Sequence, residues 1–158
     1  MTATISRPKI SNWETSNIPN LTGKTALITG ANSGLGYYTA KALAEKNAHV
    51  VIACRSIEKA NQTIKKLKGL NPEGLFTPLE LDLSDLKNIV EVQSKIFDNF
   101  ENLDLLINNA GIMHPPKTLS AQGYEIQFAV NHLAHMLLTL KLLPIIEKKE
   151  ESRIVTVT

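Results

Sequence analysis

The sequence predicts an α/β protein with a parallel sheet of five strands in the order 3-2-1-4-5 and helices on both faces. From Lys24 onward, short apolar runs alternate with segments of helical periodicity. A glycine-punctuated turn follows the first apolar run, and Pro78 interrupts the third. Proline removes a hydrogen-bond donor from the ladder, so the third strand is expected at an edge of the sheet, in agreement with this strand order.

The expected elements follow in order along the chain. Apolar runs predict strands at residues 25–29, 49–54, 75–81, 103–107 and from 153 onward. Helical spacing predicts helices over residues 34–46, 85–100 and about 120–148, and one more after Ser56. Ser56 and Ser84 are expected to cap two of these helices. Pro144 is expected to interrupt or kink the last one.

The composition is typical of one globular domain with a surface arm. Of the 158 residues, 43% are hydrophobic and 20% are charged, which is enough for one core. Residues 1–23 are polar and contain two prolines, so we interpret them as an extended arm that Trp13 pins to the body. The domain itself is expected to cover residues 24–158.

Charge and cysteine content limit the partners and the compartment. The net charge is +2, from 17 basic and 15 acidic residues, which is too balanced to favour nucleic acid or an anionic membrane. The single cysteine, Cys54, excludes an internal disulfide and fits a reducing compartment. No apolar run approaches the length of a membrane span, and the N-terminus lacks the apolar stretch of a signal peptide. We therefore expect a cytoplasmic protein without a membrane span.

The first strand leads directly into a turn with the glycine spacing G-x-x-x-G-x-G. Glycine allows a tight turn and lets bare backbone approach a ligand. The turn also begins a helix, whose free N–H groups and dipole favour phosphate. Ser33 could be proposed as a nucleophile, but no base is placed near it, and a hydroxyl of a phosphate-binding turn explains it better. The residues of this turn are Gly30, Asn32, Ser33, Gly34, Leu35 and Gly36.

Arg55 follows the second strand, about twenty residues past the glycine turn, where an NAD enzyme would place an acidic residue for the ribose hydroxyls. The next acidic residue is Glu58. A guanidinium group suits the 2′-phosphate of NADP(H), which predicts that form of the cofactor. The alternative is that Arg55 only caps a surface turn.

Two further strand ends carry candidate residues for the adenosine side of a dinucleotide. Asp82 and Leu83 follow the third strand, where the carboxylate could accept a hydrogen bond from an adenine amine. The alternative is that Asp82 caps the next helix, although Ser84 could do so without it. The fourth strand leads into Asn109, Ala110 and Gly111, small residues that let backbone pack against a cofactor, while the asparagine amides can tie strand ends together.

These motifs together resemble the short-chain dehydrogenase/reductase family, in particular its retinol-dehydrogenase and protochlorophyllide-reductase branch. The resemblance covers residues from about 21 to the end. The segments that carry it are Thr29–Gly36, Cys54–Ser56, Asp82–Leu83, Asn108–Gly111 and Phe128–His135.

The resemblance implies a Rossmann-fold oxidoreductase that moves hydride between NADP(H) and a small carbonyl or alcohol substrate. The turn and Ser33 would hold the phosphates and Arg55 the 2′-phosphate. Asn131 matches the family's helix asparagine, whose carbonyl holds a water in the proton relay, and it is the candidate catalytic residue. The remaining candidates, which would bind the adenosine side, are Asp82, Leu83, Asn109, Ala110 and Gly111.

The family's catalytic Ser and Tyr-x-x-x-Lys follow strand five, and the sequence ends within that strand. One literal Tyr-x-x-x-Lys occurs, from Tyr37 to Lys41, but it opens the helix behind the phosphate turn. We therefore expect a Rossmann domain truncated after strand five, which binds cofactor and is inactive alone. The alternative is a non-catalytic NADP(H)-binding or protein-interaction module.

The end of the chain also predicts an incomplete surface. Strand five would be an exposed edge, and the apolar helix from Leu133 to Leu143 would lack cover on one side, which favours marginal stability or a homo-oligomer. His132 and His135 lie three residues apart and could share a metal. No further ligands lie nearby in the sequence, so we expect a structural or hydrogen-bonding role and no metal site.

Overall fold

The computed structural model describes residues 12–158, and its five parallel strands form one sheet in the order β3-β2-β1-β4-β5. The predicted strand order is confirmed, with β3 at one edge and β5 at the other. The strands are β1 (Thr25–Thr29), β2 (His49–Cys54), β3 (Phe76–Glu80), β4 (Leu105–Asn108) and β5 (Arg153–Thr156).

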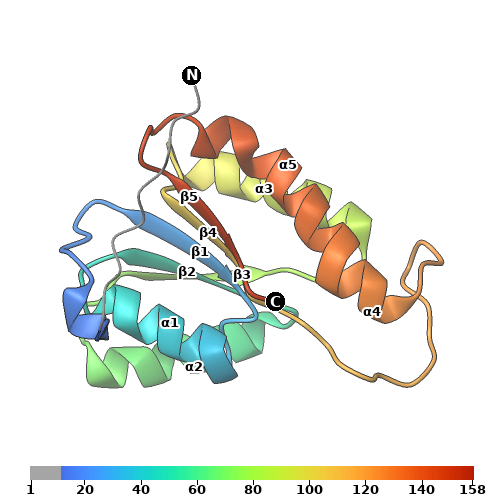
Figure 1. Cartoon of the computed structure of the whole chain (residues 1–158), viewed down its shortest axis with the longest axis horizontal. Helices are drawn as coiled ribbons and strands as arrows, with labels where there is room; N and C mark the ends of the chain where they lie inside the picture. The colour runs from blue at the N-terminus through green and yellow to red at the C-terminus, as the bar shows by residue number, and fades with distance from the viewer. Residues whose placement is uncertain (1–11) are drawn as a thin grey trace.

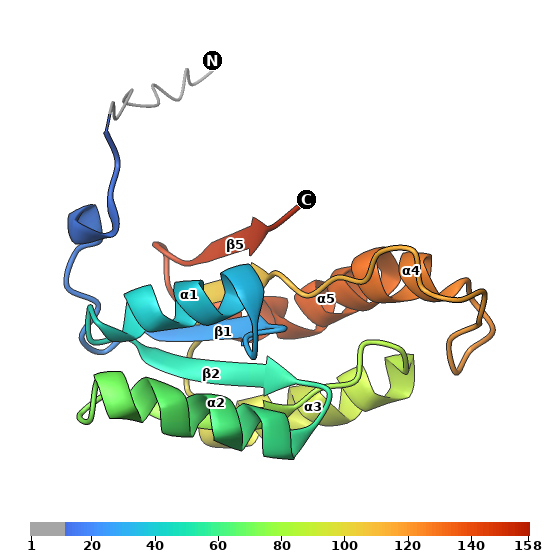
Figure 2. The ribbon, with the colours of Figure 1, turned by 90° about the horizontal axis from the view of Figure 1, so that it is seen from below.

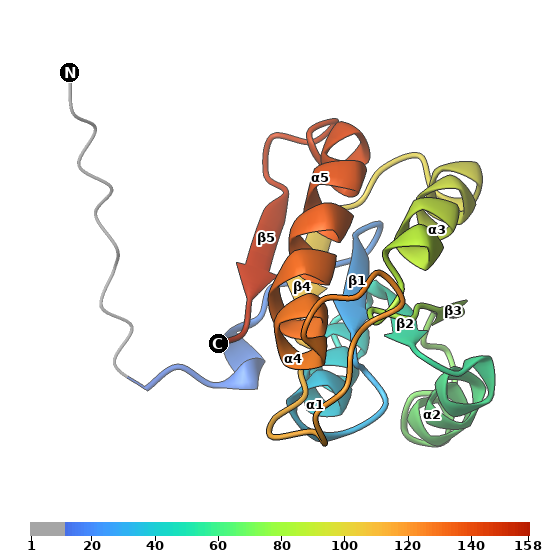
Figure 3. The ribbon, with the colours of Figure 1, turned by 90° about the vertical axis from the view of Figure 1, so that its right-hand side faces the viewer.

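Helices cover both faces of this sheet. Figure 1 shows α1 (Gly34–Ala44) and α2 (Ile57–Leu70) below it, and α3 (Leu86–Asn99) and α5 (Ala134–Ile146) above it. Figure 3 shows the same three layers from the side. The shorter elements are the 3₁₀ turn η1 (Thr15–Asn17), the one-turn helix α4 (Ile126–Phe128) and the π-helical turn η2 (Ala129–Leu133).

Alternating side chains of the central strands build two separate apolar cores. Leu27 and Leu106 are fully buried in the cluster under α3 and α5. Their neighbour Ile28 is fully buried in the cluster under α1 and α2. Because successive strand residues point to opposite faces, a strand buried on both sides reads as a continuous apolar run, as β2 does. The two cores fix the strands against each other, so the loops at their carboxyl ends have a defined position.

The parallel register brings four loops together at the carboxyl ends of the strands, which we call the carboxyl edge of the sheet. Thr29 pairs with Ala53 of β2, and Asn108 pairs with Thr156 of β5. The glycine turn after β1 therefore lies beside the segments that follow β2 and β4, and the segment after β3 adjoins β2. In Figure 2, β1 and β2 run in the same direction, and their arrowheads end at this edge. Ligands of open α/β sheets bind here.

One of the two predicted helix caps is confirmed. Ser56 Oγ accepts a hydrogen bond from the N–H of Lys59 at 3.3 Å and caps α2. Ser84 does not cap α3, because Asp85 takes that position and accepts from the N–H of Lys87 at 2.9 Å. Ser84 instead donates its hydroxyl to Asp82 Oδ1 at 2.6 Å, which removes it from the helix end.

The long helical region differs from the prediction in two respects. It begins at Ile126 instead of residue 120, because Leu119 and Glu125 form an antiparallel bridge that closes a turn between them. Its irregular part is the π-helical turn η2, whereas Pro144 lies inside α5 without ending it. The buried Leu142 and Ile145 on either side of the proline anchor this helix to the sheet, which offsets the loss of one backbone hydrogen bond.

The segment before β1 is attached through residues other than Trp13. Trp13 is 54% exposed, so the prediction that it pins the arm is wrong. Ile18 and Leu21 pack against the core under α1, and the N–H of Leu21 donates to the carbonyl of Lys46 at 2.7 Å. The first eleven residues of the predicted arm lie outside the described residues.

The edge at β5 is uncovered in residues 12–158, as predicted. All four residues of β5 are exposed, and Val155 is 45% exposed. On α5, Met136 and Leu140 are more than half exposed. Apolar side chains from a strand edge and an adjacent helix thus remain in solvent.

One helical stretch of the described chain passes a length and composition test for a membrane span. It runs from Ile126 to Ile146, and 44% of its most apolar window is buried inside the protein. The core helix of a globular protein passes the same test, so this stretch is weak evidence for a membrane.

Candidate functional site

Two adjoining hollows lie at the carboxyl edge of the sheet and contain most of the predicted site residues. The larger has a volume of about 430 Å³ and the smaller about 340 Å³. The larger is lined by Gly30, Asn32, Arg55, Asp82, Leu83, Ala110 and Gly111 among others. The smaller adds Ser33, Leu35 and Asn109. Three predicted residues line neither hollow: Gly34, Gly36 and Asn131.

The glycine turn packs so closely that two of its glycines have no room for a side chain. A Cβ atom on Gly30, whose φ is +65°, would lie 2.9 Å from the Cα of Ala110. A Cβ atom on Gly36 would lie 2.5 Å from Nδ2 of Asn109 and 2.6 Å from the carbonyl oxygen of Gly30. These glycines therefore let α1 and the loop after β4 approach the turn closely. Gly36 contributes through this packing and does not line either hollow.

Ser33 stands where a phosphate would meet the helix. It occupies the N-cap position of α1 in extended conformation, and its side chain makes no capping hydrogen bond. Ser33 lines the smaller hollow together with Asn32 and Leu35. A free hydroxyl beside the uncapped N-terminus of a three-turn helix provides donors for an anion.

Two cations border the larger hollow. Arg55 is exposed at the end of β2, and neither of the two ion pairs found in residues 12–158 involves it. Lys59, from the first turn of α2, also lines the hollow, and it is exposed, as its helix position predicted. Cys54 lines the same hollow, where burial raises the pKa of its thiol to about 11, against a backbone hydrogen bond from Asn32 and the charge of Lys59. The thiol is thus neutral, and it was expected to be inert.

Asp82 has a structural role as well as a position in the hollow. Its Oδ1 accepts hydrogen bonds from the N–H and the hydroxyl of Ser84 at 2.9 and 2.6 Å. The N–H of Asp82 donates to Asn88 Oδ1 at 2.8 Å. The carboxylate therefore shapes the turn before α3, while Asp82 and Leu83 together form part of the wall of the larger hollow.

Asn109 ties the ends of β4 and β1 together, which was one of the predicted roles for the asparagine amides. Its Nδ2 donates to the carbonyl oxygen of Thr29 at 2.9 Å. Its N–H and that of Ala110 both donate to Thr29 Oγ1 at 2.9 Å. The side-chain amide is thus engaged with the protein, and the residue lines the smaller hollow beside Gly111.

Asn131 lies behind this loop. Its Oδ1 accepts from the N–H of Ile112 and its Nδ2 donates to the carbonyl oxygen of Ile112, both at 2.9 Å. Its own carbonyl oxygen lies 3.2 Å from Nδ1 of His135. The side chain of the candidate catalytic asparagine therefore holds the backbone of the loop.

His135 has the hydrogen-bonding role expected of it. It is buried, and its Nε2 lies 2.9 Å from Thr29 Oγ1. His132 instead stacks on Phe128, with ring centroids 5.3 Å apart. No group of three or more His, Cys, Asp or Glu side chains in residues 12–158 is placed to hold a metal ion.

The loop between β4 and α4 is fastened to the start of α3 by Gln122, which the sequence did not predict. Gln122 Oε1 accepts from the N–H of Leu86 at 3.0 Å, and Nε2 donates to Asp85 Oδ1 at 2.6 Å. Thr118 and Leu119 of the same loop line the larger hollow. An isolated glutamine in a polar turn carries no periodic or motif signal that could have identified this contact.

The only Tyr-x-x-x-Lys of the sequence faces away from both hollows. Tyr37 packs against the core under α1 and α2. Lys41 forms an ion pair with Glu45 at 3.6 Å on the same helix. This agrees with the expectation that the pair does not act on a substrate.

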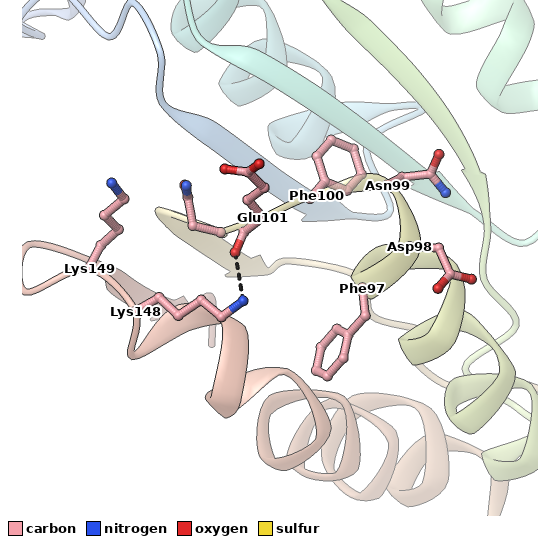
Figure 4. A pocket seen from close by; sticks show the side chains of 8 residues that line it. Phe97, Asp98, Asn99, Phe100, Glu101, Lys148 and Lys149 are labelled. Atoms are coloured by element: carbon pink, nitrogen blue, oxygen red, sulfur yellow. Dashed lines mark hydrogen bonds between the residues drawn. The ribbon is translucent and has the colours of Figure 1, made fainter.

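A third hollow, of about 750 Å³, lies at the opposite edge of the sheet (Figure 4). It is bordered by the C-terminal ends of α3 and α5, where Lys148 Nζ donates to the carbonyl oxygen of Glu101 at 3.0 Å. Ligands of parallel α/β sheets bind at the carboxyl ends of the strands, so this hollow is not the candidate site.

The chain is similar to known dehydrogenases over most of its length. The family model for short chain dehydrogenase matches residues 24–158. Human retinol dehydrogenase 13 is 41% identical over 136 residues, which is 86% of this chain and 41% of that protein. The chain thus spans less than half the length of this relative.

Solved structures agree with the sequence matches. A metagenomic short-chain oxidoreductase in complex with NADP superposes with a TM-score of 0.77 at 25% identity, over 88% of this chain and 63% of that one. A Haemophilus influenza oxidoreductase with bound NAD gives a TM-score of 0.72 at 26% identity, over 89% and 56%. The fold, the glycine turn and these similarities lead to one conclusion: the chain belongs to the short-chain dehydrogenase/reductase family, in its retinol-dehydrogenase-like branch.

Proposed function

We propose that the chain is the cofactor-binding part of an NADP(H)-dependent oxidoreductase that acts on a small carbonyl or alcohol substrate. The observation that carries this proposal is the double hollow at the carboxyl edge of the sheet, with the glycine turn at its centre and Arg55 and Lys59 at its border. Its larger part, about 430 Å³, falls within the range of small-molecule sites. Bound NADP(H) would supply or accept the hydride.

The residues present fit a dinucleotide. The close contact of Gly30 with Ala110 leaves bare backbone at the turn, and the unengaged hydroxyl of Ser33 lies beside the N-terminus of α1. These groups suit the phosphates. Asp82 and Leu83 would flank the adenine, and Ala110 and Gly111 would line the adenosine side.

The preference for NADP(H) over NAD(H) rests on Arg55 and Lys59. Structural relatives carry either form of the cofactor, so they do not decide between them. Two cations at the larger hollow, neither of which takes part in the two ion pairs of residues 12–158, provide the charge that a 2′-phosphate needs. An acidic residue would be needed there for NAD(H), and the nearest one, Glu58, bonds to Ser56 instead.

We further propose that the 158 residues alone do not catalyse hydride transfer. The single Tyr-x-x-x-Lys, Tyr37 to Lys41, lies against the core and cannot reach a substrate in either hollow. We therefore find no candidate in residues 12–158 for the proton donor of the reaction. The side chain of Asn131 is bound to the backbone of the loop that would line the cofactor. The proposed compartment is the cytoplasm, on the strength of one buried, free cysteine.

Titration of the chain with NADPH and with NADH tests the cofactor assignment. Wild type is expected to prefer NADPH, and Arg55→Ala or Lys59→Ala to weaken NADPH binding about tenfold or more, since hydrogen bonds to charged groups contribute about 1.5–3 kcal/mol. NADH affinity should change little. Lys65→Ala removes the same charge from an exposed site on α2 and serves as the control. Equal wild-type affinity for the two cofactors would refute the 2′-phosphate assignment.

The second candidate function is a non-catalytic NADP(H)-binding or protein-interaction module. The exposed strand β5 and the uncovered Met136 and Leu140 favour an interacting partner. Assay of NADPH oxidation with a panel of aldehydes and ketones separates the possibilities. Turnover by the isolated chain would overturn the proposal that it is inactive alone.

A further inference from the structure

The segment Asn109–Ile112 is held at both ends by side chains from other elements. At its start, Thr29 Oγ1 accepts the N–H groups of Asn109 and Ala110, each at 2.9 Å. At its end, Asn131 binds both the N–H and the carbonyl of Ile112 at 2.9 Å. Three residues of this segment, Asn109, Ala110 and Gly111, line the smaller hollow.

His135 connects the two anchors. Its Nε2 lies 2.9 Å from Thr29 Oγ1, and its Nδ1 lies 3.2 Å from the carbonyl oxygen of Asn131. The hydrogen bonds thus form a closed ring that runs from Thr29 through the loop to Ile112, then through Asn131 and His135 back to Thr29. Within this ring the imidazole joins α5 to β1 directly, and beside the ring Asn108 Nδ2 donates to Thr139 Oγ1 of α5 at 3.0 Å.

The ring fixes the tautomer of His135. A threonine hydroxyl has two acceptor lone pairs and one proton to donate. Two backbone N–H groups already occupy the lone pairs of Thr29 Oγ1. Its proton must therefore go to an acceptor, and Nε2 of His135 at 2.9 Å is much better placed than the carbonyl oxygen of Ile107 at 3.5 Å. His135 then carries its proton on Nδ1 and donates it to the carbonyl of Asn131.

We propose that His135, as the neutral Nδ1–H tautomer, is a positioning residue that closes this ring and so fixes the cofactor-facing segment Asn109–Gly111, and that its protonation opens the ring. An imidazolium would direct an N–H at Thr29 Oγ1, which has no lone pair left to accept it. The ring itself does not depend on a cofactor, whereas its effect on binding rests on the proposed function.

The surroundings of His135 favour the neutral form. Burial lowers the pKa of the imidazole, and the bond to the Asn131 carbonyl opposes this only in part. The groups that face the ring from β1 and η2 are the uncharged Thr29 and Asn131. In residues 12–158 no carboxylate, lysine or arginine pairs with it, and His132, the nearest titratable group along the chain, stacks on Phe128.

Nitrogen-15 NMR of the histidine side chains in the cofactor-free chain tests the ring directly. His135 is expected to show a protonated Nδ1 and an unprotonated Nε2 at pH 7. Thr29→Ser, which keeps the hydroxyl, should preserve this signature, and the isosteric Thr29→Val should lose it. A protonated Nε2, or a mixture of the two tautomers, would refute the proposal whether or not the chain binds a cofactor.

The pH dependence of the loop provides the second test. The protection factor of the Ala110 amide, which corrects for the intrinsic slowing of hydrogen exchange at lower pH, should fall in wild type as pH falls through the titration of His135. NADPH affinity should fall about tenfold over the same range, and His135→Gln should flatten this dependence while His132→Gln leaves it intact. Unchanged protection of the Ala110 amide through the His135 titration would contradict ring opening. If the NMR and hydrogen-exchange results are as expected but the chain does not bind NADPH, the proposed function is wrong and the proposal for the ring stands.

Discussion

Gln122 Nε2 donates a 2.6 Å hydrogen bond to Oδ1 of Asp85, the residue that caps α3. The same glutamine accepts the N–H of Leu86 through Oε1. One side chain therefore joins the loop before α4 to the first turn of α3. The loop residues Thr118 and Leu119 and the turn residues Asp82 and Leu83 line the larger hollow. We therefore expect the width of that hollow to depend on the contact of Gln122 with the start of α3.

Replacement of Gln122 by alanine is expected to release the loop. The pKa of Asp85 is held below its ordinary value first by the bond from Gln122 and second by the N–H of Lys87, so it should rise in the variant. Loss of the bond to the Leu86 N–H should cost about 0.5–1.5 kcal/mol. NMR titration of the Asp85 carboxyl and urea unfolding measure these effects. Gln62→Ala on the exposed face of α2 is the control, and an unchanged Asp85 pKa would argue against the contact.

Gly36→Ala is expected to destabilise the domain. The added Cβ would lie 2.5 Å from Asn109 Nδ2 and 2.6 Å from the carbonyl oxygen of Gly30, so α1 must move away from the turn. Overpacking of this kind costs about 1–3 kcal/mol. The midpoint of urea unfolding measures the change.

Gly69→Ala is the matched control for this substitution. Gly69 lies in α2, and a Cβ added there meets nothing within 4 Å. Because glycine destabilises a helix interior relative to alanine, Gly69→Ala should stabilise the domain by about 0.5–1 kcal/mol. A Gly36→Ala variant as stable as wild type would contradict the close contact behind the glycine turn.

How far the sequence predicted this molecule depends on the range of the interaction concerned. The alternation of strands with helices predicted the strand order, and Pro78 agreed with the edge position of the third strand, because apolar runs, helical spacing and a proline are all read from short stretches of sequence. The ring through Thr29 and His135 was not predicted, since its members lie 106 positions apart in the chain. In the sequence, Thr29 appears only as a threonine at the end of an apolar strand, and His135 only as a histidine on an apolar helix.

The errors have equally specific causes. Asp85 and Ser84 are both good N-caps, and the neighbouring carboxylate of Asp82 takes the serine hydroxyl. Pro144 was expected to interrupt or kink the last helix, but α5 runs without interruption from Ala134 to Ile146.

Acid is expected to destabilise the folded chain through two histidines. Burial lowers the pKa of both His49 and His135 in the folded state, so the unfolded chain binds more protons as pH falls below about 6.5. Their contribution to stability is therefore present above that pH and is lost as pH falls toward the folded pKa values. The free energy of unfolding should fall by up to about 1.4 kcal/mol per pH unit for each histidine that is protonated in the unfolded chain and neutral in the folded one.

Urea unfolding at a series of pH values between 7.5 and 5 measures this dependence. His135→Gln should reduce the slope more than His49→Gln, because His135 is 5% exposed and His49 only partly buried. A stability that rises on acidification through this range would reverse the predicted sign for both groups.

The exposed edge predicts self-association of the chain. Val155 is 45% exposed on β5, the last strand of the sheet in residues 12–158, and unpaired strand edges template pairing with a second chain. Val155→Lys places a charge on that edge and should shift sedimentation toward the monomer and remove the dependence of the thermal midpoint on protein concentration. Val90→Lys is a matched control, because Val90 is equally exposed but lies on α3, away from the edge. A wild-type chain that sediments as a monomer at all concentrations and melts sharply would show that the edge is not an association surface.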